Sequence, residues 1–194
     1  DFHIPIMSLA KILRITTETI PFPVPLFISP PNKSSKSIDH KLRIGIVWAG
    51  KKTHKNDRNR SCPFKYFIDL FSTPNTFFYS LQKGGREADI ENAGCEALIT
   101  NLAPQLNNFK DTASFISELD LIISVDTATA HLAGSIGKPT WVILPYSADW
   151  RWMRASKTSP WYPSMQLFRQ SRPKDWENVF EKIKIKLKKM VLKN

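Results

Sequence analysis

Two segments of the sequence hold residue types that bind anionic ligands, and the sharper of them starts at Asp126. It reads Asp-Thr-Ala-Thr-Ala-His and directly follows an apolar stretch at 121–125. A helix that begins here would present free backbone N–H groups and the positive end of its dipole, both of which attract phosphate. The hydroxyl groups of Thr127 and Thr129 would add further donors. This segment therefore predicts a phosphate-binding helix start.

Asp126 and His131 each allow two interpretations. His131 follows Thr127 by four residues, so both lie on one helix face, where the imidazole could donate a hydrogen bond to a diphosphate. Alternatively, His131 is satisfied within the packing of the helix. A carboxylate repels phosphate, so Asp126 is expected either to cap the helix or to orient a sugar hydroxyl.

The second segment is the loop at 51–61, which holds five Lys or Arg residues and one His against one Asp. Guanidinium and ammonium groups both suit phosphate, so Arg58 and Arg60 are candidate ligands. The alternative is an ordinary solvated loop, since loops are usually polar. Gln82 and Lys83 follow another apolar stretch, and Lys83 could neutralise a leaving diphosphate.

The elements that must position these residues alternate between short apolar strands and helices. Strands are expected at 42–48, 76–81, 121–125, 140–144 and 165–168, and helices at 63–71, 112–118, 127–135 and 176–191. That alternation predicts an α/β fold, with a Rossmann-like parallel sheet flanked by helices. Asp111 and Asp126 are expected to cap the second and third helices. Since such sheets bind ligands at the carboxyl ends of their strands, the polar strand ends should meet in one crevice.

Charge and cysteine content narrow the classes of partner. The 194 residues carry 28 Lys and Arg against 17 Asp and Glu, a net charge of +11, which favours anionic partners. Six Lys and no acid lie at 182–193, either as a solvated helix face or as a peripheral contact with an acidic membrane surface. Nucleic-acid binding is not expected, because the charges are not interleaved with aromatics on a recognition element. Two Cys are typical of reduced thiols in a cytoplasmic setting.

Several enzyme classes lack their motifs in this sequence. It has no Gly-x-x-x-x-Gly-Lys-Ser/Thr phosphate loop, no Gly-x-Gly-x-x-Gly and no Gly-x-Ser-x-Gly elbow. P-loop ATPases, dinucleotide dehydrogenases and serine hydrolases of the elbow type are therefore not predicted. The four His and two Cys lack zinc-ligand spacing, so no metal is expected.

The aromatic block at 149–163 allows two interpretations as well. Its Trp and Tyr side chains could stack on a base or a sugar, or hold Arg in cation–π contact. Alternatively, they form a hydrophobic plug under a long loop.

Taken together, several motifs resemble one enzyme family. The segment at 124–134, followed by Gly137-Lys138-Pro139, looks like the nucleotide-sugar site of bacterial family 9 glycosyltransferases, the heptosyltransferase group. The stretches at 48–50, 56–61, 80–84, 149–152 and 159–163 also resemble the glycosyltransferase-like domain found behind tetratricopeptide repeats in bacteria. That domain is distantly similar to O-linked N-acetylglucosamine transferases. The resemblance covers about residues 1–180.

The resemblance implies a place in a two-domain enzyme. Residues 41–194 would form the nucleotide-sugar-binding C-terminal half of a GT-B fold, and residues 1–40 would be a remnant of the N-terminal half with its linker. The missing N-terminal half is an expected partner, and tetratricopeptide repeats are a further candidate. The catalytic base is expected in that half, so no catalytic residue is named, and the isolated chain is expected to be inactive.

The resemblance also implies a reaction. It is metal-independent transfer of a sugar from a nucleoside diphosphate sugar to a glycan, lipid or protein acceptor, without a cofactor. The residues expected to bind the donor are Arg58, Arg60, Gln82, Lys83, Asp126, Thr127, Ala128, Thr129 and His131. The alternative is a non-catalytic nucleotide- or sugar-binding module that retains the fold.

Overall fold

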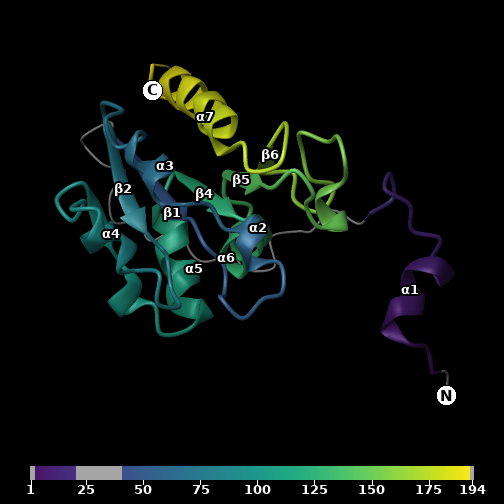
Figure 1. Cartoon of the computed structure of the whole chain (residues 1–194). Coiled ribbons are helices and arrows are strands. Elements are labelled where there is room, and N and C mark those ends of the chain that lie inside the picture. Colours follow the sequence, from purple (N-terminus) through teal and green to yellow (C-terminus); the bar gives the residue numbers. More distant parts are fainter. Residues whose placement is uncertain (1–2, 21–40, 193–194) are drawn as a thin grey trace.

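Six parallel strands form one sheet in the computed structural model, which describes residues 3–20 and 41–192 (Figure 1). Neighbouring strands follow the order β3-β2-β1-β4-β5-β6, and all five pairs are parallel. The strands are β1 Leu42–Val47, β2 Thr76–Ser80, β3 Ile99–Asn101, β4 Leu121–Val125, β5 Thr140–Leu144 and β6 Met165–Arg169. The α/β, Rossmann-like sheet expected from the sequence is confirmed.

Helices cover both faces of this sheet. The helices are α1 Ile6–Ile12, α2 Asp57–Arg60, α3 Lys65–Ile68, α4 Asp89–Asn92, α5 Phe109–Glu118, α6 Ala128–Ser135 and α7 Trp176–Val191, with 3-10 turns at η1 Ala103–Gln105 and η2 Trp150–Trp152. Residues of α3 and α7 share one core cluster, and residues of α5 and α6 share another. In Figure 1, α7 lies above the sheet and α5 and α6 lie below it.

The core explains why the central strands could be predicted. Every residue of β4 and β5 is buried, as expected for strands that are covered on both faces and consist mostly of apolar residues. In α7, Val179, Ile183 and Leu187 are fully buried at helical spacing, which gives the helix one apolar stripe. The helix predicted at 176–191 is confirmed.

The order of the strands reverses next to β1. From β1 the chain moves outward to β2 and β3, and it then returns to the other side of β1 to form β4, β5 and β6. At such a reversal, the connections that follow the two central strands run in opposite directions. They leave a crevice at the carboxyl edge of the sheet, between β1 and β4.

Two predicted helix caps are wrong. The N-cap of α5 is Asn108, whose side chain accepts hydrogen bonds from the N–H groups of Lys110 and Asp111 at 2.8 and 3.0 Å. The helix therefore starts at Phe109, earlier than predicted. The N-cap of α6 is Thr127 rather than Asp126.

Two short elements have no signal in the sequence. Helix α4 is four residues long, and β3 is three residues long with a single buried residue, Ile99. Neither is long enough to show an apolar period. The position of β3 depends on its pairing with β2, which local sequence does not reveal.

The N-terminal segment 3–20 contains α1, whose apolar side chains are largely exposed, with Ile6 at 81%. The predicted linker lies mostly in residues 21–40, outside the described residues, so the division into 1–40 and 41–194 stays a prediction. Across residues 3–20 and 41–192, no helix has both the length and the apolar character needed to cross a membrane.

Candidate functional site

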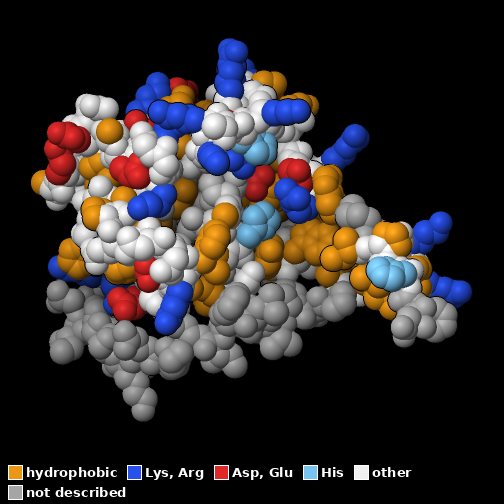
Figure 2. Space-filling view, turned by 90° about the horizontal axis from the view of Figure 1, so that it is seen from below, with side chains coloured by type: hydrophobic (Ala, Val, Ile, Leu, Met, Phe, Trp, Pro, Cys, Tyr) orange, Lys and Arg blue, Asp and Glu red, His pale blue; other side chains and the backbone are white. Residues whose placement is uncertain are grey.

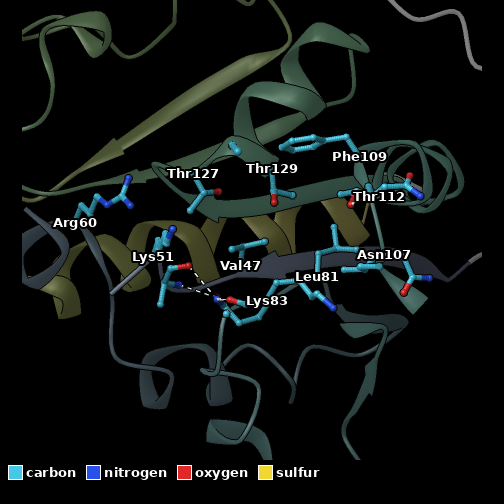
Figure 3. A pocket seen from close by; sticks show the side chains of 17 residues that line it. Val47, Lys51, Arg60, Leu81, Lys83, Asn107, Phe109, Thr112, Thr127 and Thr129 are labelled. Carbon is cyan, nitrogen blue, oxygen red and sulfur yellow. Dashed lines mark hydrogen bonds between the residues drawn. The ribbon is translucent and has the colours of Figure 1, made fainter. Parts of the chain in front are cut away.

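A pocket of about 770 Å³ opens at the carboxyl ends of β1, β2 and β4 (Figure 3). Val47 and Ala49 line it from the end of β1, Leu81 from the end of β2, and Thr127 from the turn after β4. It therefore occupies the crevice where the strand order reverses, the usual ligand site of this architecture. Three of the polar strand ends noted in the sequence meet here.

The pocket has a basic end and an apolar end. Figure 3 shows Arg60 and Lys51 at one end, near Thr127. Phe109, from the start of α5, lies toward the other end with Asn107. The space-filling view from below shows Lys and Arg side chains along the upper rim of that face of the molecule (Figure 2). A ligand with negative charge at one end and a flat polar ring at the other would match the two ends of the pocket.

Helix α6 begins in the wall between these ends. Thr127 caps the helix, since its Oγ1 accepts a hydrogen bond from the N–H of Ala130 at 3.4 Å and lies 3.0 Å from the hydroxyl oxygen of Ser124. Ala128 and Thr129 follow it and line the pocket. Their N–H groups have no acceptor inside the helix, as at every helix start. The structure thus brings Thr127, Ala128 and Thr129 together at the pocket, where the sequence predicted a phosphate site.

Arg60 reaches the pocket across the bare backbone of Gly50. Its Nη1 donates a hydrogen bond to the carbonyl oxygen of Asp126 at 3.0 Å, at the turn between β4 and α6. A Cβ atom at position 50 would lie 2.3 Å from the other terminal nitrogen of Arg60. A side chain at position 50 would therefore force the guanidinium group of Arg60 to shift from this position.

Asp57 holds Arg60 from behind, a role that sequence reasoning missed. Asp57 is buried, and its Oδ1 accepts a hydrogen bond from Ser61 Oγ at 2.6 Å and lies 3.8 Å from Arg60 Nε. Its Oδ2 accepts from Arg86 Nη2 at 2.9 Å. The Ser61 hydroxyl oxygen also accepts the N–H of Gly50 at 3.0 Å. The only signal in the sequence was a single acid within a basic loop.

Gln82 braces the pocket, and its side chain is fully engaged. Its Oε1 accepts from the N–H groups of Trp48 and Ala49 at 3.1 and 2.9 Å, and its Nε2 donates to the carbonyls of Ala49 and Lys83 at 3.0 and 2.8 Å. These bonds use the whole capacity of the amide. Gln82 therefore joins the ends of β1 and β2 and has no free polar group for the ligand contact predicted for it.

Lys83 lines the pocket on the wall across from α6 (Figure 3). Its Nζ donates a hydrogen bond to the carbonyl oxygen of Ala103 at 2.8 Å. To contact a phosphate, the ammonium group would have to leave this carbonyl.

His131 and Asp126 do not line the pocket. Nδ1 of His131 lies 3.2 Å from the hydroxyl of Tyr162, and its ring stacks on Trp152 with centroids 5.1 Å apart. Its Nε2 lies 3.6 Å from Asp126 Oδ1. The contacts of His131 agree with the packing interpretation, and its contact with phosphate stays a prediction. Asp126 pairs with His131 instead of facing a ligand.

Asp126 is a charged group inside the fold. Burial raises the pKa of its carboxyl, but hydrogen bonding to His131, a contact with Trp152 and the charges of His131 and Arg60 outweigh burial, so the pKa lies below its ordinary value of 3.8. The buried indole N–H of Trp152 makes no hydrogen bond of standard geometry. The closeness of that N–H to Asp126 nevertheless favours the carboxylate. Asp126 is therefore ionised at neutral pH.

Arg58 lies apart from the predicted donor residues. It lines a separate hollow with Lys52 and Lys55, whereas Arg60 lines the pocket. The two Arg residues therefore line different hollows, and the donor contact of Arg58 stays a prediction. Both belong to the four-residue helix α2, which turns their side chains in different directions.

Sequence reasoning also missed the wall formed by residues 106–109 and 112. Placing the cap at Asp111 assigned most of this segment to a featureless loop. The available signal was Asn108, a favoured N-cap residue placed three positions before Asp111.

Other reactive or aromatic groups lie away from the pocket. Burial raises the pKa of the Cys62 thiol well above its ordinary value, which makes it a poor nucleophile. Trp152 is fully buried, as the plug interpretation predicts, whereas Trp150 is 68% exposed beside Arg151. Within 3–20 and 41–192, no three His, Cys, Asp or Glu side chains form a group that could hold a metal ion.

The family model for Glycosyltransferase family 9 (heptosyltransferase) matches residues 76–186. Protein FlbA from Caulobacter vibrioides is 29% identical over 140 residues, which make up 70% of this chain and 23% of FlbA. The chain thus spans less than a quarter of the length of that relative.

Two solved structures are similar to this chain. E. coli heptosyltransferase WaaC with ADP has a TM-score of 0.54 at 14% identity, covering 80% of this chain and 45% of that one. The C-terminal domain of a glycosyl transferase group 1 family protein (LpcC) from Francisella tularensis has a TM-score of 0.47 at 15% identity, covering 79% and 76%. The match to WaaC shows that the sheet and its helices have the arrangement found in GT-B glycosyltransferases.

These matches support the resemblance to family 9 glycosyltransferases but not the second resemblance noted in the sequence. They do not support the link to repeat-containing, O-linked N-acetylglucosamine transferase-like enzymes. The family match, by contrast, runs from the start of β2 into α7 and includes the turn that begins α6. Because it spans more than half of the sequence, the chain belongs to glycosyltransferase family 9, the heptosyltransferase family.

Proposed function

We propose that this chain binds the nucleoside diphosphate sugar of a glycosyltransferase and forms the donor-binding half of that enzyme. The pocket between β1 and β4 carries the proposal, because its basic end adjoins the start of α6 and its other end is apolar. Membership of family 9 supports glycosyl transfer. The solved relative WaaC holds ADP, a ligand of the proposed class.

The two ends of the pocket orient the donor. The diphosphate would lie between Arg60 and the N–H groups of Ala128 and Thr129, where guanidinium, helix dipole and amide protons all favour negative charge. The base would extend toward Phe109, whose ring is 65% exposed and free to stack. The amide of Asn107 can then hydrogen-bond the edge of the base.

The proposed reaction breaks the bond between the anomeric carbon of the sugar and the oxygen of the diphosphate. An acceptor hydroxyl attacks that carbon, and the electron pair of the broken bond leaves with the diphosphate. Arg60, Lys51 and the amide protons of α6 stabilise the growing negative charge. Since these groups supply positive charge at the leaving group, the proposed step needs neither a metal ion nor a cofactor.

The general base is proposed to come from another part of the protein. The described lining of the pocket contains no Asp, Glu or His side chain, so it offers no ordinary base for an acceptor hydroxyl. The chain covers 45% of WaaC and 23% of FlbA. A second half that closes over the pocket would supply the base and contacts to the acceptor hydroxyl, and we expect the chain alone to bind donor without transferring sugar.

Calorimetric titration of the full chain with UDP, ADP and GDP tests the proposal. At least one of them should bind. Arg60→Gln should weaken that binding about tenfold, the loss expected from one charge-assisted hydrogen bond. The matched control is Arg154→Gln, because Arg154 is exposed and does not line the pocket.

Two results would contradict the proposal. Failure of all three nucleotides to bind would show that the pocket is not a donor site. Equal losses of nucleotide affinity in Arg60→Gln and Arg154→Gln would show that Arg60 does not contact the nucleotide. Donor hydrolysis or sugar transfer by the longer protein separates the proposed enzyme from a binding module that merely retains the fold.

A further inference from the structure

A second hollow lies on the other side of the loop at 51–61. Its volume is about 760 Å³, and Lys52, His54, Lys55 and Arg58 line it from the loop, together with Arg86 from the segment before α4. We call it the basic hollow. Lys51 and Arg60 of the same loop line the donor pocket instead. The loop thus separates two concave surfaces and places cations on both.

The acids of the basic hollow are already engaged. Both oxygens of Asp57 accept hydrogen bonds, from Ser61 and Arg86. Asp89 accepts one from the indole N–H of Trp48 at 2.8 Å. Within the described residues, neither acid forms an ion pair with Lys52, Lys55 or Arg58.

The cations of the hollow, by contrast, have donors to spare. Among residues 3–20 and 41–192, no hydrogen bond or ion pair occupies the side chains of Lys52, Lys55 or Arg58. Arg86, by contrast, is held by Asp57, and its Nε is buried. The three free cationic side chains around one hollow are suited to a phosphate group, which accepts several charge-assisted hydrogen bonds at once.

The hollow adjoins the reacting end of the donor pocket. Asp57 forms part of its wall and lies 3.8 Å from Arg60, which lines the basic end of the pocket. The sugar would be attached to the diphosphate at that end, so a group in the hollow lies on the side of the reacting sugar and not of the base.

We infer that the basic hollow binds a phosphate group carried by the sugar acceptor. Only the identification of the phosphate carrier as the sugar acceptor rests on the proposed function. Binding of a phosphate at the hollow follows from the charges of the hollow itself. An acceptor anchored by its phosphate would have its hydroxyl directed toward the donor sugar across the Asp57–Arg60 pair.

The test uses the full chain, with glucose 6-phosphate and inorganic phosphate as probes in calorimetric titrations. The triple variant K52Q/K55Q/R58Q should weaken binding of glucose 6-phosphate at least about tenfold, since it removes three charge-assisted contacts. The matched control is K182Q/K188Q/K189Q, which removes three exposed charges from α7 and should leave binding unchanged. Circular dichroism and thermal midpoints verify that both variants are folded.

Further titrations identify which site binds the phosphate and which molecule carries it. Lys51→Gln, in the donor pocket, should leave binding of glucose 6-phosphate intact, and the hollow triple variant should leave binding of nucleotide intact. Loss of binding in Lys51→Gln but not in the triple variant would overturn the inference. Binding of inorganic phosphate with exclusion of the sugar phosphate would overturn the acceptor assignment. Absence of nucleotide binding would contradict the proposed function, whereas the titration with glucose 6-phosphate would still test phosphate binding at the hollow.

Discussion

Asp57 controls the basic end of the donor pocket although it does not line it. Two Arg side chains and one hydroxyl converge on its buried carboxylate. Removing this buried charge would lower stability mainly because its partners would be left unpaired. The same carboxylate separates the donor pocket from the basic hollow, so one side chain orders both surfaces.

Asp57→Asn should therefore reduce both stability and nucleotide binding. We expect the free energy of unfolding to fall by about 1–3 kcal/mol, because Arg60 and Arg86 lose their counter-charge. Nucleotide affinity should fall several-fold as Arg60 loses its support. Urea unfolding and calorimetry measure the two effects. Asp69→Asn is the control, since Asp69 is exposed; an equal loss there would contradict the role of Asp57.

The lowered pKa of Asp126 predicts a dependence of stability on acidic pH. A carboxyl with a lowered pKa in the folded state binds its proton more readily after unfolding. Its contribution is fully present above the ordinary value of 3.8 and is lost as the pH falls through the lowered pKa. The stability difference between the wild type and Asp126→Asn should therefore be constant near neutral pH and shrink below about pH 4.

Urea unfolding of both proteins across this range measures the difference. A difference that stays constant, or grows, as the solution becomes more acidic would show that the charge of Asp126 does not stabilise the fold.

Individual residues were predictable only where their role is local. Thr127 and Thr129 were identified correctly as pocket residues because a helix start after a strand exposes its own N–H groups. The roles of Gln82 and His131 depend on partners distant in the sequence. Ala49 engages the amide of Gln82, and Trp152 and Tyr162 enclose His131. No pattern around either residue reveals those partners.

Whole elements were predicted more reliably than their ends. Five of the six strands and the long helix α7 have strong apolar patterns, and the structure contains all of them. At the starts of α5 and α6, two good capping residues lie close together in the sequence, and the sequence alone does not decide between them. At α6, Asp126 is drawn away to His131, which leaves the cap to Thr127.

Helix α7 offers a matched pair of substitutions that tests its packing. Leu187 is fully buried against the sheet, and Ile185, two residues earlier, is 51% exposed. Leu187→Ala should lower the free energy of unfolding by about 2–5 kcal/mol through lost contacts and a cavity. Ile185→Ala should change it by less than about 0.5 kcal/mol.

Denaturant unfolding monitored by circular dichroism measures both changes. Similar losses in the two variants would indicate that the helix packs through a different face.

The sheet predicts how the whole molecule responds to a ligand. All six strands belong to one sheet, and the donor pocket is built from its centre, so residues 41–192 should unfold in one transition. A nucleotide at 100 times its dissociation constant should then stabilise the folded chain by about 2.7 kcal/mol.

Thermal unfolding with and without nucleotide measures this shift. Two separate transitions, with only one of them moved by nucleotide, would contradict a single cooperative unit.

The contact between Gly50 and Arg60 has a consequence for sequence variation. A methyl group at position 50 would displace the guanidinium group at position 60, so a substitution at 50 changes where Arg60 can lie. Across related sequences we expect covariation, with arginine at position 60 paired with glycine at 50, and larger residues at 50 tolerated only beside a shorter partner. A lineage that breaks the pairing would have to hold its diphosphate by other means.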